Sequence, residues 1–145
     1  KKYLSDAVIS GCDVSIDALD VAEKNKEVLG LDVSFFNCDI LKEEIEEEYD
    51  YIISNPPYIA EKEKSTMHVN VLNHEPHLAL FVKDQDPLLF YKRIVALAEK
   101  QSATCFFETS EFYRESLDLW LEGLNLRFEW KLDFQGKDRI LKVYT

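Results

Sequence analysis

The chain has 145 residues and a net charge of −11, and 46% of its residues are hydrophobic. This length and composition suit one domain with a real core, and no apolar stretch approaches the roughly 20 residues needed to span a bilayer. The acidic balance disfavours a protein whose main partner is nucleic acid, because binding to a phosphate backbone depends on basic side chains.

Strand and helix signals alternate in the first part of the chain. The segment from Val8 to Asp13 predicts a short strand. Ser15 can cap a helix that runs to about Leu29, and Gly30 is a typical C-terminal stop. Two further strands are expected over the ranges Val33 to Cys38 and Tyr49 to Ser54.

The second part of the chain continues this alternation and then changes it. A helix is expected after Pro87, a strand from Ala103 to Glu108 and a helix from Phe112 to Leu121. The last two strands are predicted from Leu126 to Phe134 and from Arg139 to Tyr144, around a Gln-Gly-Lys-Asp turn. The pattern indicates an α/β fold with a mainly parallel sheet and a C-terminal antiparallel hairpin at its edge.

One long connection fits no periodic element. It runs from Ile59 to Lys83 and begins directly after an Asn-Pro-Pro-Tyr stretch. Connections of this length are usually functional or mobile. We interpret it as a lid or substrate loop, and a peripheral loop with short helical turns is the alternative.

Three of the predicted strands end in a polar side chain. These side chains are Asp13, Asp39 and Asn55. Parallel strands would bring them to one edge of the sheet, where open α/β sheets bind ligands. Asp13 could accept both ribose hydroxyls of a nucleoside, and Asp39 could accept a hydrogen bond from an adenine amino group, although such residues often only cap turns.

The stretch Asn55-Pro56-Pro57-Tyr58 is more specific. Two prolines end the strand abruptly, since proline has a fixed φ and no N–H. The side-chain oxygen of Asn55 and the carbonyl of Pro56 could hold both N–H groups of a primary amide or an exocyclic amine, and Tyr58 offers a flat face for stacking. This arrangement suits a weak nitrogen nucleophile that attacks a methyl sulfonium, because alignment can contribute ~7–11 kcal/mol.

Metal chemistry is not expected from the sequence. His74 and His77 have Pro76 between them and no evident third ligand. The three cysteines are widely spaced and odd in number, which predicts buried thiols in a reducing compartment and hence a cytoplasmic protein.

The sequence resembles the HemK/PrmC family of S-adenosylmethionine-dependent protein-glutamine methyltransferases. The matching stretches follow the family's order across nearly the whole chain. They are CDVSIDALDVAEKN (Cys12–Asn25), CDIL (Cys38–Leu41), YDYIISNPPYIA (Tyr49–Ala60), HEPHLAL (His74–Leu80), FYKRI (Phe90–Ile94), FFE (Phe106–Glu108) and GKDRILK (Gly136–Lys142). NPPY alone is shared with adenine-N6 methyltransferases, and the later stretches are more particular.

The resemblance implies a Rossmann-like class I methyltransferase fold and S-adenosylmethionine as cofactor, with no metal. It implies that Asp13 binds the ribose and that Asp39, with Ile40 beside it, contacts the adenine. Asn55 would lie near both cofactor and substrate. The implied substrate-binding residues are Asn55, Pro56, Pro57, Tyr58 and Glu75, with Asn55, Pro56 and Tyr58 as the catalytic group. The implied substrate is the glutamine of the Gly-Gly-Gln motif of peptide chain release factors.

The family's glycine-rich loop has no counterpart here, because none of the four glycines forms such a motif. We therefore expect residues 1–145 to be one incomplete catalytic domain, the C-terminal part of a longer protein without the first strand. The resemblance places that strand at the centre of the sheet, so the strands of Asp13 and Asn55 would each keep an unpaired edge. An altered or self-associating sheet, and weak or no cofactor binding by the chain alone, are expected.

Two alternatives remain open at this stage. An adenine-N6 methyltransferase acting on DNA or RNA would use the same NPPY geometry, but it should carry a basic substrate face. A non-catalytic α/β binding module would have no need for Asn55 together with Tyr58.

Overall fold

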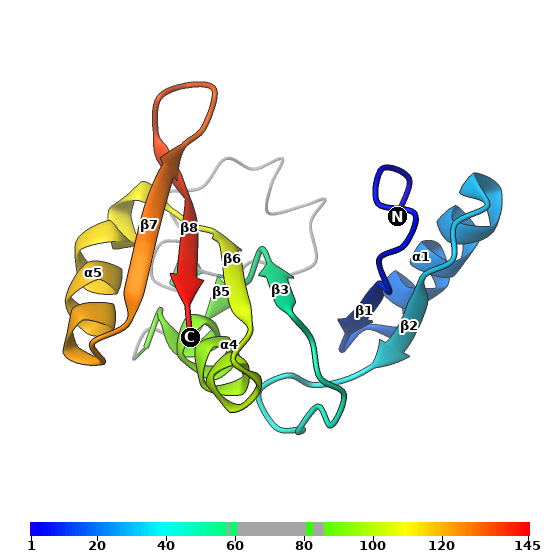
Figure 1. The fold of residues 1–145 in the computed structure, drawn as a ribbon, viewed down its shortest axis with the longest axis horizontal. Helices are drawn as coiled ribbons and strands as arrows, with labels where there is room; N and C mark the ends of the chain where they lie inside the picture. The colour runs from blue at the N-terminus through cyan, green and yellow to red at the C-terminus, as the bar shows by residue number, and fades with distance from the viewer. Residues whose placement is uncertain (58, 61–80, 83–85) are drawn as a thin grey trace. The chain divides into compact units, whose positions relative to one another are not determined.

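The computed structural model describes residues 1–57, 59–60, 81–82 and 86–145 and places them in two compact units. The first unit is Lys1–Glu44 and the second is Ile45–Thr145 (Figure 1). Among the described residues, no helix is both long and apolar enough to cross a membrane.

The first unit is a β-α-β arrangement. Its elements are β1 (Ser10–Asp13), α1 (Ile16–Leu29) and β2 (Ser34–Asn37), and β1 pairs in parallel with β2. Ser15 caps α1 by accepting a hydrogen bond from the Ala18 amide, and Gly30 ends it in the left-handed conformation at φ 60°. Cys38 is the one buried hydrophobic residue of this unit, so its core is small.

The second unit holds most of the secondary structure. Its helices in the described ranges are α4 (Leu89–Gln101), η2 (Glu111–Tyr113, a 3₁₀ turn) and α5 (Arg114–Gly123). Its strands are β3 (Tyr51–Ser54), β4 (Ile59–Ala60), β5 (Phe81–Val82), β6 (Thr104–Glu108), β7 (Arg127–Leu132) and β8 (Asp138–Tyr144). The main sheet has the order β3-β6-β8-β7, and the short strands β4 and β5 pair separately.

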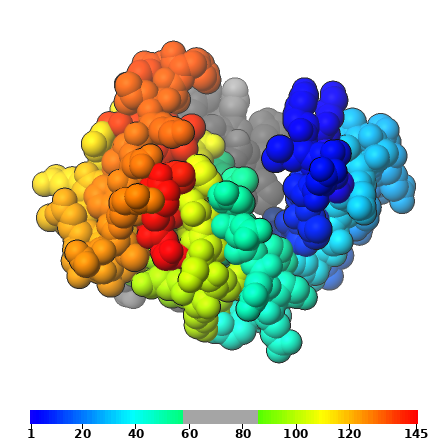
Figure 2. Space-filling model, in the orientation of Figure 1, coloured from blue at the N-terminus to red at the C-terminus, as the bar shows by residue number. Residues whose placement is uncertain are grey.

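Direction changes across this main sheet. β3 and β6 are parallel, whereas β8 runs antiparallel to both β6 and β7. Figure 2 shows β8, in red, at the surface between β7 and β6. The predicted α/β fold with a C-terminal antiparallel hairpin is therefore confirmed.

Helices cover one face of the main sheet. α4 packs against β6 and α5 against β7. The rings of Tyr91 on α4 and Phe107 on β6 meet edge to face at 5.3 Å. Most of the fully buried side chains among the described residues of the unit come from these helices and from alternate positions of β6 and β8, including Cys105, Leu141 and Val143.

The strands that carry Asp13 and precede Asn55 each have one unpaired edge in the described part of the chain. β1 pairs only with β2, and β3 pairs only with β6. Tyr51 and Ile53, which share one face of β3, are 65% and 81% exposed. The unpaired edges predicted for the strands of Asp13 and Asn55 are thus present in the described residues.

Candidate functional site

The predicted site residues lie at the carboxyl ends of parallel strands. Asp13 is the last residue of β1, and Asp39 and Ile40 come two and three residues after β2 ends at Asn37. Asn55, Pro56 and Pro57 follow the end of β3 at Ser54. In an α/β sheet this edge is the usual place for a ligand.

Asp13 is exposed and well oriented. One of its carboxylate oxygens accepts a hydrogen bond from the Ser15 amide at 2.8 Å, which fixes the turn into α1. Its backbone oxygen accepts from the Cys38 amide at 3.1 Å and from the side-chain amide of Asn37 at 2.9 Å. The second carboxylate oxygen thus retains acceptor capacity for hydroxyl groups such as those of a ribose.

Asp39 sits in a tight turn. Its carboxylate accepts from the Leu41 amide at 3.1 Å and from the Lys42 ammonium at 2.6 Å, while its own amide donates to a carboxylate oxygen of Glu43. The hydrogen bond from Lys42 is the main cause that holds the pKa of Asp39 below its usual value. Asp39 is therefore a fixed anion, and Ile40 beside it is half-buried.

The motif after β3 has an exposed amide and a covered proline. Asn55 is exposed, Pro56 is buried and Pro57 is half-buried. The pairing of Ser54 with Phe107 places Asn55 in line with Glu108 at the end of β6. The side-chain amide of Asn55 is open to solvent and lies next to a rigid proline, so it is well placed to form hydrogen bonds with a substrate amide or amine.

Sequence reasoning missed several residues near these strand ends. Asn37 and Lys42 are the partners that fix the backbone of Asp13 and the carboxylate of Asp39. Thr109 follows β6, is fully buried, and its hydroxyl has no hydrogen-bond partner among the described residues. The one sequence signal for Asn37 was its place as a polar residue at a strand end. Its contacts could not be predicted, because they depend on the register between the strands.

Each candidate acid of the first unit follows a cysteine. The prediction of buried thiols is confirmed for Cys38 and Cys105 and is wrong for Cys12, which is an exposed residue. Partial burial of the Cys12 thiol, and then the neighbouring Cys38 and Asp13, raise the pKa of Cys12. No group of three or more potential metal ligands occurs in the described ranges.

The structure brings the predicted residues together in two sets. Asp13, Asp39 and Ile40 belong to the first unit, and the Asn55-Pro56-Pro57 run belongs to the second. The other two predicted site residues, Tyr58 and Glu75, lie outside the described residues. Each set offers chiefly hydrogen-bond acceptors: carboxylates in the first, and an amide and carbonyls in the second.

Solved structures define the class of fold. TehB from Haemophilus influenzae aligns over 99% of this chain and 51% of its own, with a TM-score of 0.51 and 15% identity. The Pyrococcus abyssi tRNA (uracil-54, C5)-methyltransferase, solved with S-adenosyl-L-homocysteine, covers 98% of this chain and 29% of its own, with a TM-score of 0.50 and 16% identity. The fold is that of class I methyltransferases.

Sequence comparisons identify the family. A family model described as "Methyltransferase small domain" matches residues 1–81. The chain therefore belongs to the methyltransferase small domain family.

Individual relatives narrow the family assignment further. A protein from Flavobacterium psychrophilum is 41% identical over 98% of this chain, and one from Bacteroides thetaiotaomicron is 40% identical over 97%. Both are named release factor glutamine methyltransferase, which confirms the resemblance to the HemK/PrmC family. The chain spans 52% of the length of each of these two relatives.

Proposed function

We propose that this chain is the main part of a catalytic domain that methylates the glutamine side chain of the Gly-Gly-Gln motif in peptide chain release factors. The observation that carries the proposal is the Asn55-Pro56-Pro57 run at the carboxyl end of β3 in a class I methyltransferase fold. Two relatives named release factor glutamine methyltransferase, 40% and 41% identical over nearly the whole chain, support this substrate.

The residues of the first unit fit the cofactor. S-adenosylmethionine would supply an electrophilic methyl group on a sulfonium. Asp13 keeps one carboxylate oxygen clear of the Ser15 bond and can accept from the ribose hydroxyls. Asp39, fixed by Lys42, can accept from the adenine amino group, and Ile40 can pack on the base.

The second unit would hold the acceptor amide. The side-chain oxygen of Asn55 accepts one N–H of the glutamine amide and the carbonyl of Pro56 accepts the other, so the nitrogen lone pair points in one direction. Pro57 keeps this turn rigid, Tyr58 stacks on the planar amide, and Glu75 helps to shape the substrate loop. The gain comes from alignment, and the proton leaves after the nitrogen has become cationic.

The same proposal covers the domain organisation, location, partners and self-association of the chain. Residues 1–145 act as one domain in function, although they fold as two compact units. The protein works in the cytoplasm on a protein substrate, without a metal ion, and nucleic acid and membranes are not its partners. The unpaired edges of β1 and β3 allow the isolated chain to self-associate.

The first test is calorimetric titration with S-adenosylmethionine. This chain is titrated beside a version of the protein that continues upstream of Lys1. Binding by the longer version alone would mean that residues 1–145 hold part of the cofactor site. Binding by neither version would refute the proposed function.

The second test measures methyl transfer to a release factor. Mass spectrometry of the Gly-Gly-Gln peptide reports the methylated glutamine, and an oligonucleotide substrate tests the adenine alternative. We expect Asn55→Ala to lower the rate by about 100-fold, because loss of alignment has effects of that order. Asn25→Ala, on the exposed surface of α1, is the control and should leave the rate unchanged.

A further inference from the structure

The segment formed by η2 and α5 carries two separate apolar faces. Leu117 and Leu121 are fully buried. Phe112 and Leu119, seven positions apart and so on one side of the helical segment, are 81% and 65% exposed. A helix that already buries one apolar side usually presents polar residues on the other, so this second apolar side indicates an interaction surface.

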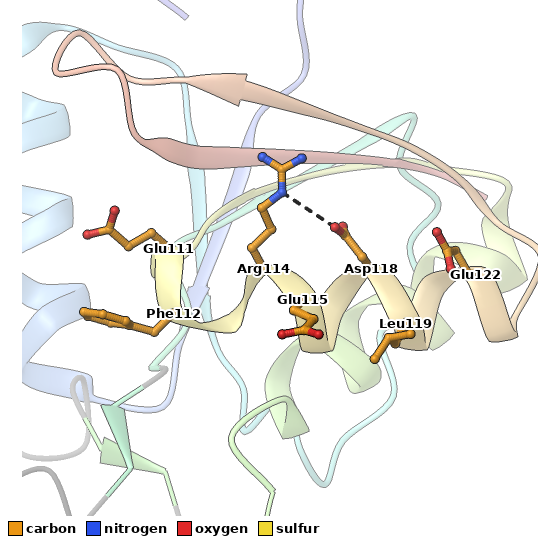
Figure 3. A pocket seen from close by; sticks show the side chains of 7 residues that line it. All are labelled: Glu111, Phe112, Arg114, Glu115, Asp118, Leu119 and Glu122. Atoms are coloured by element: carbon orange, nitrogen blue, oxygen red, sulfur yellow. Dashed lines mark ion pairs between the residues drawn. The ribbon is translucent and has the colours of Figure 1, made fainter.

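A shallow groove of about 400 Å³ runs along this exposed side. In Figure 3 the side chains of Phe112, Glu115 and Leu119 project from the same side of the segment. The residues that line the groove are Glu111, Phe112, Arg114, Glu115, Asp118, Leu119 and Glu122. Acidic side chains therefore stand between and beside the two exposed apolar ones.

The charge of the groove is negative because four of its lining residues are acids, and its one cation, Arg114, is already paired. Arg114 forms ion pairs with Asp118 and Asp138, and its guanidinium lies over the Trp130 ring at 5.3 Å. Lys137, which does not line the groove, pairs with Glu111 at 2.6 Å. Among the described residues, no ion pair is recorded for the lining residues Glu115 and Glu122, and both are exposed.

We infer that this groove docks a basic segment of the protein substrate, an inference that rests on the proposed function. Apolar side chains of that segment would cover Phe112 and Leu119, and its lysines or arginines would pair with Glu115 and Glu122. The sign of the charge selects this occupant, because phosphate groups of nucleic acids and anionic lipids would be repelled. Such pairing steers association and weakens as salt is added.

A labelled peptide tests the groove directly. The probe is a fluorescein-labelled helical peptide of leucine and lysine, about 15 residues or roughly four helical turns long, titrated with the whole chain and followed by anisotropy. We expect Glu115→Lys/Glu122→Lys and, separately, Phe112→Ser to weaken binding by about tenfold, equivalent to the loss of about one good contact. Wild-type affinity should also fall between about 50 and about 300 mM salt.

Matched controls separate the groove from the general acidity of the chain. Glu46→Lys/Glu48→Lys changes the net charge equally at exposed acids elsewhere in the same unit. Phe134→Ser removes another exposed ring, 97% accessible, from the β7–β8 turn. Both controls should bind the peptide like the wild type. Equal weakening in groove and control variants would show non-specific attraction and would overturn the inference.

Methylation kinetics connect the groove to the substrate. With a release factor as substrate, the Glu115→Lys/Glu122→Lys variant should raise KM and keep kcat, because the groove contacts no reacting atom. An unchanged KM beside an active wild type would overturn the inference and leave the proposed function standing. If a version that binds S-adenosylmethionine were inactive on the release factor, the proposed function would be refuted, and the peptide titration would still decide whether the groove binds basic segments.

Discussion

Asn37 holds the end of β1 from the neighbouring strand: its side-chain amide donates to the backbone oxygens of Asp13 at 2.9 Å and Val14 at 3.0 Å. Asp13 and Asn37 are also register partners in the parallel pair. The backbone that presents the proposed ribose-binding carboxylate is thus fixed by a residue of β2.

Removal of this amide should loosen the strand end. We expect Asn37→Ala to cost about 1 kcal/mol locally, since each net hydrogen bond contributes about that much and the site is exposed. Hydrogen exchange at the Cys38 amide, which donates to Asp13, reports the change and should become faster. Asn25→Ala on α1 should leave this exchange rate as it is; equal acceleration in both variants would show that Asn37 has no special role.

Titration of Asp39 tests its contact with Lys42. The pKa of Asp39 is lowered chiefly by the Lys42 hydrogen bond, so Lys42→Ala should move the pKa up toward the usual value of 3.8. Because the folded-state pKa is lowered, the stabilisation from this contact is present above pH 3.8 and is lost as the pH falls below it. The chemical shift of the Asp39 carboxyl carbon, followed by NMR as the pH is changed, gives the pKa of Asp39 in the wild type and in Lys42→Ala. Lys24→Ala is the control, and an unmoved Asp39 titration in Lys42→Ala would contradict the contact.

Thr109 gives a prediction on stability. Its buried hydroxyl lacks a partner among the described residues, so Thr109→Val, which keeps the shape, should stabilise the second unit by about 1 kcal/mol. Both tryptophans, Trp120 and Trp130, are in this unit, so urea unfolding followed by their fluorescence reports it. Thr109→Ser retains the hydroxyl, loses a methyl group and should destabilise. If the valine variant were also destabilised, the hydroxyl would have a partner in solution.

Cys105 predicts a loss of stability at alkaline pH. Burial raises the pKa of its thiol from 9.0 to about 12. The folded state therefore keeps the proton while the unfolded state releases it, and stability falls as the pH rises from 9 toward 12. Between pH 8 and pH 10 this group should remove about 1.4 kcal/mol. The difference between wild type and Cys105→Ala, measured by urea unfolding at both pH values, should show this change; a constant difference would argue against a buried thiol.

Local signals in the sequence predicted the elements well. Ser15 and Gly30 mark the ends of α1 as expected, and Pro56 ends β3. The exposure of Ile16 (65%) and Val28 (85%) could not be predicted in this way. Periodicity shows which side of a helix is apolar, but it does not show whether anything packs on that side.

The candidate site was predictable only in part. Asp13, Asp39 and Asn55 follow apolar runs, so their place at strand ends could be read from the chain. The roles of Asn37 and Lys42 could not, because they depend on strand register and on the turn after β2. The unpaired hydroxyl of Thr109 depends on packing around the end of β6, which no short sequence pattern records.

The boundary between Glu44 and Ile45 crosses no strand pair in the described part of the chain, since every pairing lies within one unit. The acids proposed to bind the cofactor and the motif proposed to hold the substrate amide are consequently encoded on two consecutive stretches of the gene. A substitution within residues 1–44 would therefore alter the proposed cofactor-binding acids, and one within residues 45–145 the proposed acceptor motif.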